Sequence, residues 1–197
     1  MESIIYKFVN GINGLKNPRN FLLELMPKNS TCAEIGVWKG EFSKKILKIV
    51  GPKELHLIDP WKYESEQTYD KAWYGGKIGS QNAMDQIYKY INDQFNNEIK
   101  NNQVFIHRNL SVVAGKSFED NYFDWVYIDG NHLYEFVKKD IELFYKKVKK
   151  GGYITGDDYK KEGWWKGGVK KAVDEFIQKG IVKKIEIKNN QFILEKI

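Results

Sequence analysis

The chain has 197 residues, a formal charge of +6, 42% hydrophobic residues and 15% aromatic residues. This length suits one domain, since domains commonly run to about 100–200 residues, and the apolar content excludes a disordered or low-complexity chain. No apolar run approaches the roughly 18 residues that span a bilayer, and the N-terminal residues lack the pattern of a signal peptide. The single cysteine, Cys32, has no partner for an internal disulfide. We therefore predict one cytoplasmic domain over residues 1–197, without a membrane span.

The positive charge comes almost entirely from lysines spread along the chain, and Arg19 and Arg108 are the only arginines. Recognition of guanine edges and phosphates favours the arginine fork. A lysine-solvated surface is therefore favoured over a nucleic-acid groove, and we expect no nucleic-acid partner. A basic nucleic-acid-binding module is the alternative outside the enzymes.

Short apolar runs alternate with helix-length segments along most of the chain. The pattern predicts strands at 31–35, 54–58, 103–106, 123–128 and 152–155, with helices at 41–50, about 81–95, 112–117 and 132–148. Strands that alternate with helices favour a mostly parallel sheet covered on both faces. The expected fold class is thus α/β and doubly wound.

The C-terminal end departs from this alternation. A helix at 169–178 precedes two strand-like runs, 181–187 and 191–195, which are joined at Asn189-Asn190. Asparagine tolerates the positive φ of a tight hairpin turn. We therefore expect seven strands in all, with an antiparallel C-terminal edge strand.

Two segments lie outside the pattern. Residues 1–28 predict an N-terminal helical segment, whose helix at 18–26 has Pro18 at its first position. Residues 61–80 fit no periodicity, are rich in aromatic residues and contain glycine, so we expect a lid or an insertion there.

Ligands of open α/β sheets bind beyond the carboxyl ends of the strands. After the first strand, Gly36 and Gly40 can let the backbone turn tightly and approach a ligand, and Asp59 after the second strand is placed to bind ribose hydroxyls. The glycine spacing differs from the dinucleotide fingerprint, and Glu34 would repel a pyrophosphate but suit a cationic ligand. These residues predict S-adenosylmethionine as the cofactor; an NAD-dependent oxidoreductase is the alternative enzyme.

Acidic residues follow the fourth and fifth strands. Neighbouring strands lie about 4.8 Å apart, so Asp129, Asp157 and Asp158 should converge and offer oxygen ligands to Mg²⁺ or Mn²⁺. In the alternative reading, Asp129 caps a helix and the acid pair forms a turn. His132 lies at the same rim, where it could act as a general base or simply bond to the backbone at a helix start.

Aromatic residues follow the acid pair. Tyr159, Trp164 and Trp165 lie in a glycine-flanked stretch that suits a loop stacking on a sugar ring. Anchoring in the core is the alternative for each of them. An opposing wall would come from Trp61, Tyr69, Trp73 and Tyr74. The other two histidines, His56 and His107, are expected to be packed or strand-edge residues.

Four motifs occur in order: Ala33-Glu34-Ile35-Gly36-Val37-Trp38-Lys39-Gly40, Leu57-Ile58-Asp59-Pro60-Trp61, Tyr127-Ile128-Asp129-Gly130-Asn131-His132-Leu133-Tyr134 and Gly151-Gly152-Tyr153-Ile154-Thr155-Gly156-Asp157-Asp158-Tyr159. From about residue 30 onward the chain resembles the class I S-adenosylmethionine-dependent methyltransferases. Within them it is similar to the small branch of sugar O-methyltransferases and cephalosporin-hydroxylase-like proteins.

The resemblance implies a Rossmann-like sheet and cofactor contacts from Glu34, Gly36 and Asp59, with Asn109 or Ser111 near the adenine. It also implies a divalent metal, because metal-dependent relatives carry an acid after strand four and an acidic or amide pair after strand five. Many relatives have a second acid at the position of Asn131, and its absence here shifts the expected base to His132.

We accordingly predict an O-methyltransferase that acts on a hydroxyl of a sugar or glycan, with His132 and Asp129 as its catalytic residues. The chain lacks the Asn/Asp-Pro-Pro-aromatic motif of amino-methylating nucleic-acid enzymes. The expected partner is a small-molecule sugar or glycan, and a homo-oligomer is compatible with the sequence.

Overall fold

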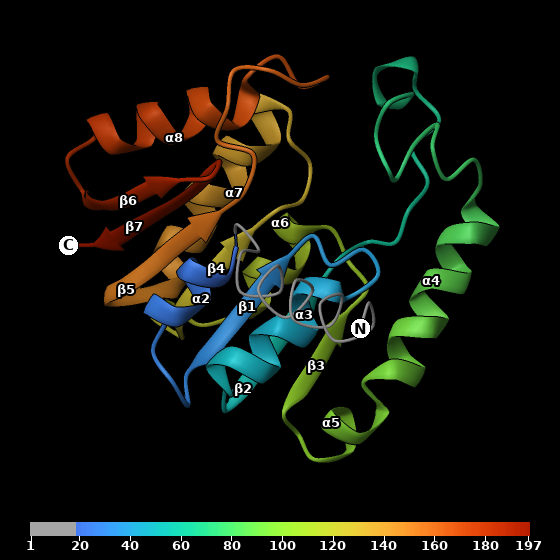
Figure 1. Ribbon diagram of the computed structural model, residues 1–197, viewed down its shortest axis with the longest axis horizontal. Helices are drawn as coiled ribbons and strands as arrows, with labels where there is room; N and C mark the ends of the chain where they lie inside the picture. Colours follow the sequence, from blue (N-terminus) through green and yellow to red (C-terminus); the bar gives the residue numbers. More distant parts are fainter. Residues whose placement is uncertain (1–18) are drawn as a thin grey trace, which may run out of the picture.

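The computed structural model describes residues 19–197, which form a seven-stranded sheet with helices on both faces (Figure 1). The strands are β1 (Thr31–Ile35), β2 (Glu54–Ile58), β3 (Val104–His107), β4 (Phe123–Ile128), β5 (Val148–Gly156), β6 (Val182–Lys188) and β7 (Gln191–Lys196). The helices are α2 (Asn20–Leu25), α3 (Glu41–Lys45), α4 (Gln81–Gln94), α5 (Asn96–Lys100), α6 (Ser111–Ala114), α7 (Tyr134–Lys147) and α8 (Gly168–Gln178). Within residues 19–197, no helix is long and apolar enough to cross a bilayer.

The strands are ordered β3-β2-β1-β4-β5-β7-β6. β1 to β5 pair in parallel, whereas β7 runs antiparallel to both β5 and β6. The predicted mostly parallel Rossmann-like sheet is thus confirmed, with its antiparallel strand β7 one place in from the edge strand β6. The carboxyl ends of β1 to β5 meet along one side, which we call the carboxyl edge.

Each face of the sheet has its own hydrophobic core. Successive side chains of a strand point to opposite faces, so Cys32 of β1 packs in one core while Ala33 and Ile35 pack in the other. The first core includes residues of α2, α3 and α4, and the second includes residues of α7 and α8. Burial on both faces explains why the parallel strands read as nearly continuous apolar runs.

Element boundaries differ from the predictions in a few places. The helix expected at 41–50 is α3 followed by a π-helical turn, Ile46–Val50. β5 begins at Val148, directly after α7, and is longer than the expected strand at 152–155. The short helix α5 was not predicted. In the hairpin turn Asn189 and Asn190 have φ of 53° and 62°, as expected.

The two segments outside the alternation are only partly regular. α2 covers Asn20–Leu25 of the helix expected at 18–26, while Pro18 and the rest of residues 1–18 lie outside the described residues. In the 61–80 segment the one regular element is a 3-10 turn at Gln67–Tyr69. Figure 1 shows this segment at the upper right, above α4.

Candidate active site

Backbone hydrogen bonds hold the strand exits together along the carboxyl edge. The N–H groups of Gly36, Asp59 and Asp129 donate to Ile58, His107 and Ile35, at 2.9, 3.2 and 2.7 Å. The N–H of Asp157 likewise donates to Ile128 at 3.3 Å. The predicted site residues that follow β1, β2, β4 and β5 are therefore neighbours in the fold.

The glycines after β1 make room for other parts of the protein. Gly36 has a φ of +89°, and a Cβ there would lie 2.2 Å from the carbonyl oxygen of Asp129. Gly40 has a φ of +73°, and a Cβ there would lie within about 3 Å of side chains on α4 and Phe95. The close approach that these glycines allow is thus between protein segments, and their contact with a ligand stays a prediction.

Asp59 fastens the loop after β1 to the end of β2. One carboxylate oxygen accepts the N–H groups of Val37 and Trp38 at 2.9 and 3.0 Å, and the other accepts the N–H of Trp61 at 2.7 Å. The side chain therefore shapes the predicted cofactor loop, and its bond to ribose stays a prediction.

Glu34 is buried beside this loop, with 2% of its surface exposed. Ser43 donates a hydrogen bond to it. Burial raises the pKa of Glu34 to about 8 even though Ser43 acts in the opposite direction. Burial therefore favours the neutral form of this carboxyl group.

The residues expected near the adenine separate in the structure. Asn109 is exposed, whereas the Ser111 hydroxyl donates to Asp140 of α7 at 2.5 Å. Asp140 is 3% exposed, and burial raises its pKa to about 6. Sequence reasoning missed Asp140; the available signal was an acid beside Val137, Ile141 and Phe144 on the apolar face of the helix.

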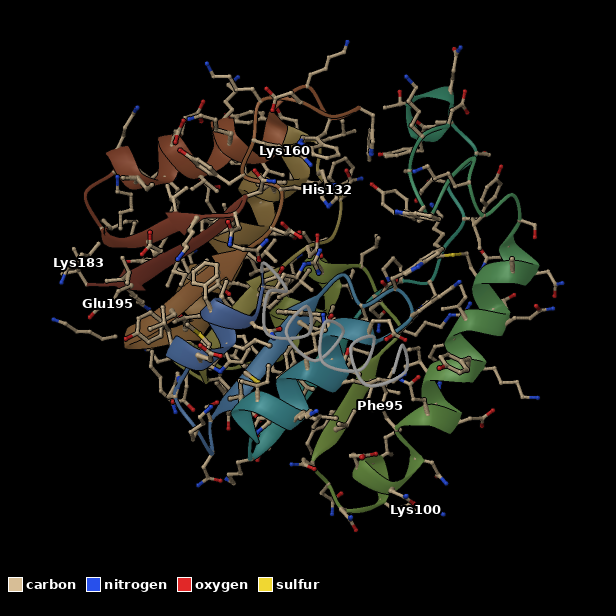
Figure 2. The ribbon with its side chains drawn as sticks, viewed as in Figure 1. Phe95, Lys100, His132, Lys160, Lys183 and Glu195 are labelled. Atoms are coloured by element: carbon tan, nitrogen blue, oxygen red, sulfur yellow. The ribbon has the colours of Figure 1, made fainter. Side chains whose placement is uncertain are left out.

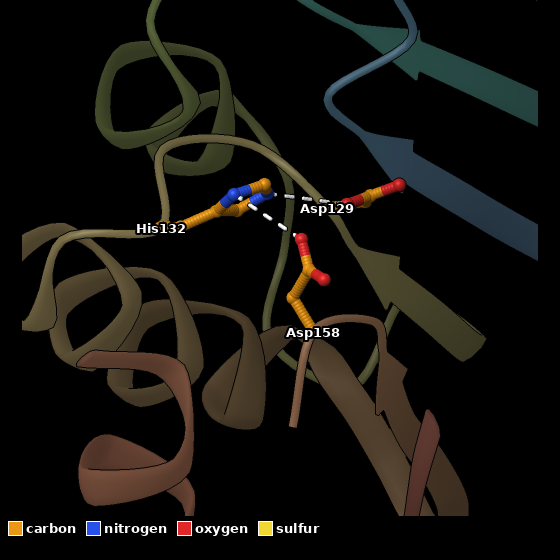
Figure 3. Close-up of side chains that lie close together, drawn as sticks. All are labelled: Asp129, His132 and Asp158. Carbon is orange, nitrogen blue, oxygen red and sulfur yellow. Dashed lines mark hydrogen bonds and ion pairs between the residues drawn. The ribbon is translucent and has the colours of Figure 1, made fainter. Parts of the chain in front are cut away.

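His132 lies between two carboxylates at the carboxyl edge (Figure 3). Its Nε2 is 3.3 Å from Oδ1 of Asp129, and its Nδ1 is 3.3 Å from Oδ2 of Asp158. Burial alone would lower the pKa of His132, but the hydrogen bond to Asp129 and the surrounding acids raise it above the usual value. Both carboxylates therefore stabilise the protonated ring.

Asp157 bonds to other groups than His132. One of its oxygens is paired with Arg19, and the other accepts bonds from Gln191 and from the N–H of Asp158. Arg19 also pairs with Asp129 at 3.1 Å, and Lys160 pairs with Asp158 at 3.1 Å. The three predicted acids are thus at one edge, but they form a network with Arg19, His132 and Lys160. Figure 2 labels two of these residues, His132 and Lys160, which lie at the same end of the sheet.

Three of these residues could hold a divalent cation. Ligand atoms of Asp129, His132 and Asp158 all lie within 4.8 Å of one another. Two carboxylates and an imidazole suit Mn²⁺, and the carboxylates suit Mg²⁺. The sequence predicted Asp129, Asp157 and Asp158 as the ligands. In the structure His132, and not Asp157, is the third residue that could bind the ion.

The tryptophan pair packs beside this group. The rings of Trp165 and Trp164 lie 4.9 and 6.2 Å from that of His132. From the 61–80 segment, Tyr69 and Tyr74 face Trp164 at 5.8 and 6.3 Å. Two buried polar atoms without a hydrogen-bond partner, Tyr74 Oη and Trp165 Nε1, also lie here.

The other predicted aromatic residues have different surroundings. Tyr159 donates to Asp174 of α8 at 2.6 Å, so its hydroxyl is directed to that helix. Trp61 is fully buried, and Trp73 is 61% exposed and lies 6.0 Å from Trp38. Of the expected opposing wall, the structure therefore brings Tyr69 and Tyr74 to the tryptophan pair.

A family model described as a methyltransferase domain matches residues 33–159. A Staphylococcus aureus protein described as a caffeoyl-CoA O-methyltransferase has a similar structure, with 14% identity, a TM-score of 0.62 and coverage of 98% of this chain and 100% of that chain. The O-methyltransferase NovP has a similar structure with 18% identity and a TM-score of 0.58, and the match covers 91% of this chain and 79% of that chain. A Streptococcus mutans protein solved with S-adenosylhomocysteine matches with 13% identity and a TM-score of 0.57 over 92% of this chain and 99% of that chain. At these identities the likeness shows the fold.

Among curated proteins, an uncharacterized protein of Acanthamoeba polyphaga mimivirus is 50% identical over 44 residues. The match spans 22% of this chain and only 20% of that protein.

Proposed function

We propose that this chain, which belongs to the methyltransferase-domain family and is a class I S-adenosylmethionine-dependent methyltransferase, acts on an oxygen atom. The proposed acceptor is a hydroxyl of a sugar or glycan. Because the chain belongs to this family, we discard the alternative of an NAD-dependent oxidoreductase. The observation that carries the choice of an oxygen acceptor is His132, held between Asp129 and Asp158 at the carboxyl edge. The fold shared with NovP agrees with this choice.

In the proposed reaction the acceptor oxygen attacks the methyl carbon of the cofactor in line with its bond to sulfur. The new O–C bond forms as the C–S bond breaks, the electron pair goes to sulfur, and S-adenosylhomocysteine leaves. The hydroxyl proton goes to Nδ1 of His132, while Asp129 holds Nε2. Asp129 and Asp158 then stabilise the imidazolium, and the protein also contributes orientation of the two reactants.

A divalent cation would be held by one ligand atom each of Asp129, His132 and Asp158. When bound, Mg²⁺ or Mn²⁺ would act as a Lewis acid that favours the alkoxide form of an acceptor hydroxyl. In its absence the residues of the chain still supply a base and two carboxylates.

We propose the aromatic wall of Trp164, Trp165, Tyr69 and Tyr74 as the acceptor side of the site. Sugar rings stack on aromatic faces through their C–H groups. The unpartnered polar atoms of Tyr74 and Trp165 would bond to sugar hydroxyls, which offer both donors and acceptors. Such a mixture of flat rings and isolated polar atoms suits a polyol.

The test is transfer of an isotope-labelled methyl group across a panel of nucleotide sugars, oligosaccharides, amines and nucleic acid, with and without EDTA. Labelled product from a sugar supports the proposal, and restoration by Mg²⁺ or Mn²⁺ after EDTA supports metal assistance. Full activity in EDTA would refute the metal while leaving the transferase. Labelling of amines or nucleic acid alone, with none of the sugars labelled, would refute the acceptor class.

A further inference from the structure

The side chain of Asn131 joins the turn that carries His132 to the 61–80 segment. Its Oδ1 accepts the N–H of Leu133 at 3.0 Å, and its Nδ2 donates to the Tyr69 hydroxyl at 3.0 Å. An asparagine that bonds to the backbone two residues further on is a common way to fix a turn. One amide group therefore holds both the turn around His132 and a ring of the aromatic wall.

The backbone of Leu133 decides the polarity of this bridge. A backbone N–H can only donate, so the amide oxygen of Asn131 must face Leu133 and its NH2 group must face Tyr69. The hydroxyl oxygen of Tyr69 accepts a hydrogen bond from that NH2 group. The O–H proton of Tyr69 is therefore directed away from Asn131.

This proton lies at the acceptor side of the site. Tyr69 is 6% exposed, and its ring lies 5.8 Å from that of Trp164, which in turn lies 6.2 Å from that of His132. Among residues 19–197, the structure shows no group that accepts the Tyr69 proton. Because buried donors in native proteins are nearly always satisfied, a bound molecule is expected to supply the acceptor atom.

We propose that Tyr69 donates this hydrogen bond to the acceptor substrate, and that Asn131 is a positioning residue that keeps Tyr69 a donor. The inference rests on the proposed function for the class of acceptor. It assigns to the substrate an oxygen, such as a ring oxygen or a second hydroxyl, near the hydroxyl that is methylated. An ammonium group at that place is disfavoured, because it has only donors and would face the Tyr69 proton.

The test reverses the polarity of the bridge without removing it. Asn131→Asp keeps one oxygen for the N–H of Leu133 and places a second oxygen, which can only accept, at Tyr69. The Tyr69 hydroxyl must then donate to this carboxylate, so it has no proton left for the substrate. Tyr69→Phe removes the hydroxyl and keeps the ring.

The readout is methyl transfer to the sugar that the native protein labels best. Tyr69→Phe should raise KM about three- to tenfold, as expected for one neutral hydrogen bond, and should leave kcat within about twofold. Asn131→Asp should raise KM by a similar factor in the native background and should have no further effect on KM in the Tyr69→Phe background. The added charge beside His132 acts with or without the Tyr69 hydroxyl, so the double-mutant cycle separates charge from polarity.

Asn121→Asp is the matched control, because it adds the same charge before β4, at the opposite end of the strand from the site. Its oxygen would still accept from Lys196, and KM and kcat should be unchanged. Calorimetry should show the native affinity for S-adenosylhomocysteine in every variant, and thermal unfolding checks that each is folded. Tyr69→Phe loses a single oxygen atom, so it tests the contact even if the change at Asn131 prevents folding.

A native KM for Tyr69→Phe would overturn the inference. An effect of Asn131→Asp on KM that is equally large with and without the Tyr69 hydroxyl would also overturn it. Both results would leave the methyltransferase and its sugar acceptor in place. If the native protein labels amines or nucleic acid but no sugar, the proposed function is wrong, and this inference is wrong with it.

Discussion

Two histidines in this molecule, His132 and His56, are both largely buried beside a carboxylate, yet their pKa values move in opposite directions. Asp129 and Asp158 flank His132 and raise its pKa despite burial. His56 lies in the sheet against Phe105 and Phe123, and burial, with the neighbouring His107, lowers its pKa to about 4 although Glu54 opposes the shift. The charge of the neighbours, more than the depth of burial, decides which histidine can take a proton.

The largest expected effect concerns the histidine at the carboxyl edge. His132→Ala should lower turnover by about 10²- to 10⁴-fold, because a general base is lost, and should leave the affinity for S-adenosylhomocysteine nearly unchanged. Steady-state kinetics and calorimetry measure the two. If His132→Ala kept the turnover of the native protein, another group would take the hydroxyl proton, and the two histidines would not differ in catalytic role.

The reciprocal change should affect stability alone. His56 is 5% exposed and contacts Phe105, Phe118 and Phe123, so His56→Ala should reduce the free energy of unfolding by about 2–3 kcal/mol through the cavity it leaves. Urea unfolding measures the loss. Turnover per folded molecule should match the native protein, and a loss comparable to that of His132→Ala would contradict the purely structural role of His56.

The low pKa of His56 predicts acid sensitivity. The unfolded chain binds a proton near pH 6.5, while the folded chain binds it only near pH 4. The contribution of this group to the free energy of unfolding is therefore fully present above pH 6.5 and is lost between pH 6.5 and 4, by about 3 kcal/mol. The lowered pKa of His107 acts in the same direction, and Glu54 and Tyr122 are the other titratable groups in contact.

His56→Phe is the test of that dependence, because it keeps an aromatic ring against Phe105 but cannot titrate. Urea unfolding at pH 7.5 and 4.5 should show a smaller acid loss for His56→Phe than for the native protein. Equal losses in the two proteins would mean that other groups carry the acid sensitivity.

The smallest expected effect concerns the outer end of the His132 network. Lys160 pairs with Asp158 and is 33% exposed, so Lys160→Gln should change turnover less than about fivefold, as partly exposed ion pairs are worth at most about 1 kcal/mol. A loss as large as that for His132→Ala would show that Lys160 itself contacts the acceptor.

Much of the fold follows from local patterns in the sequence. The five parallel strands are short apolar runs, and Asn189-Asn190 identifies the hairpin because few other residues accept its φ values. The position of His132 next to Asp129 also follows, since both come directly after β4. The order of strands at the antiparallel end does not follow, because the sequence does not show that β7 inserts between β5 and β6.

The part of the site that escaped prediction depends on side-chain direction. Adjacent residues point to opposite sides at the end of a strand. Asp157 thus shares the face of Tyr127 and contacts Arg19, whereas Asp158, with a φ of +58°, contacts His132. Arg19 lies far from Asp129 and Asp157 in the sequence, and such long-range pairs produce no periodic pattern that could predict them.

The crossing of Gly36 beneath the backbone of Asp129 limits how this scaffold can be recombined. Even an alanine at 36 would displace the exit of β4, and with it Asp129 and the loop that carries His132. Loops grafted from a relative on either side of the crossing would therefore have to be exchanged as a pair. A chimera that keeps both Gly36 and the backbone of Asp129 should therefore fold more stably than one that replaces residues 33–40 alone.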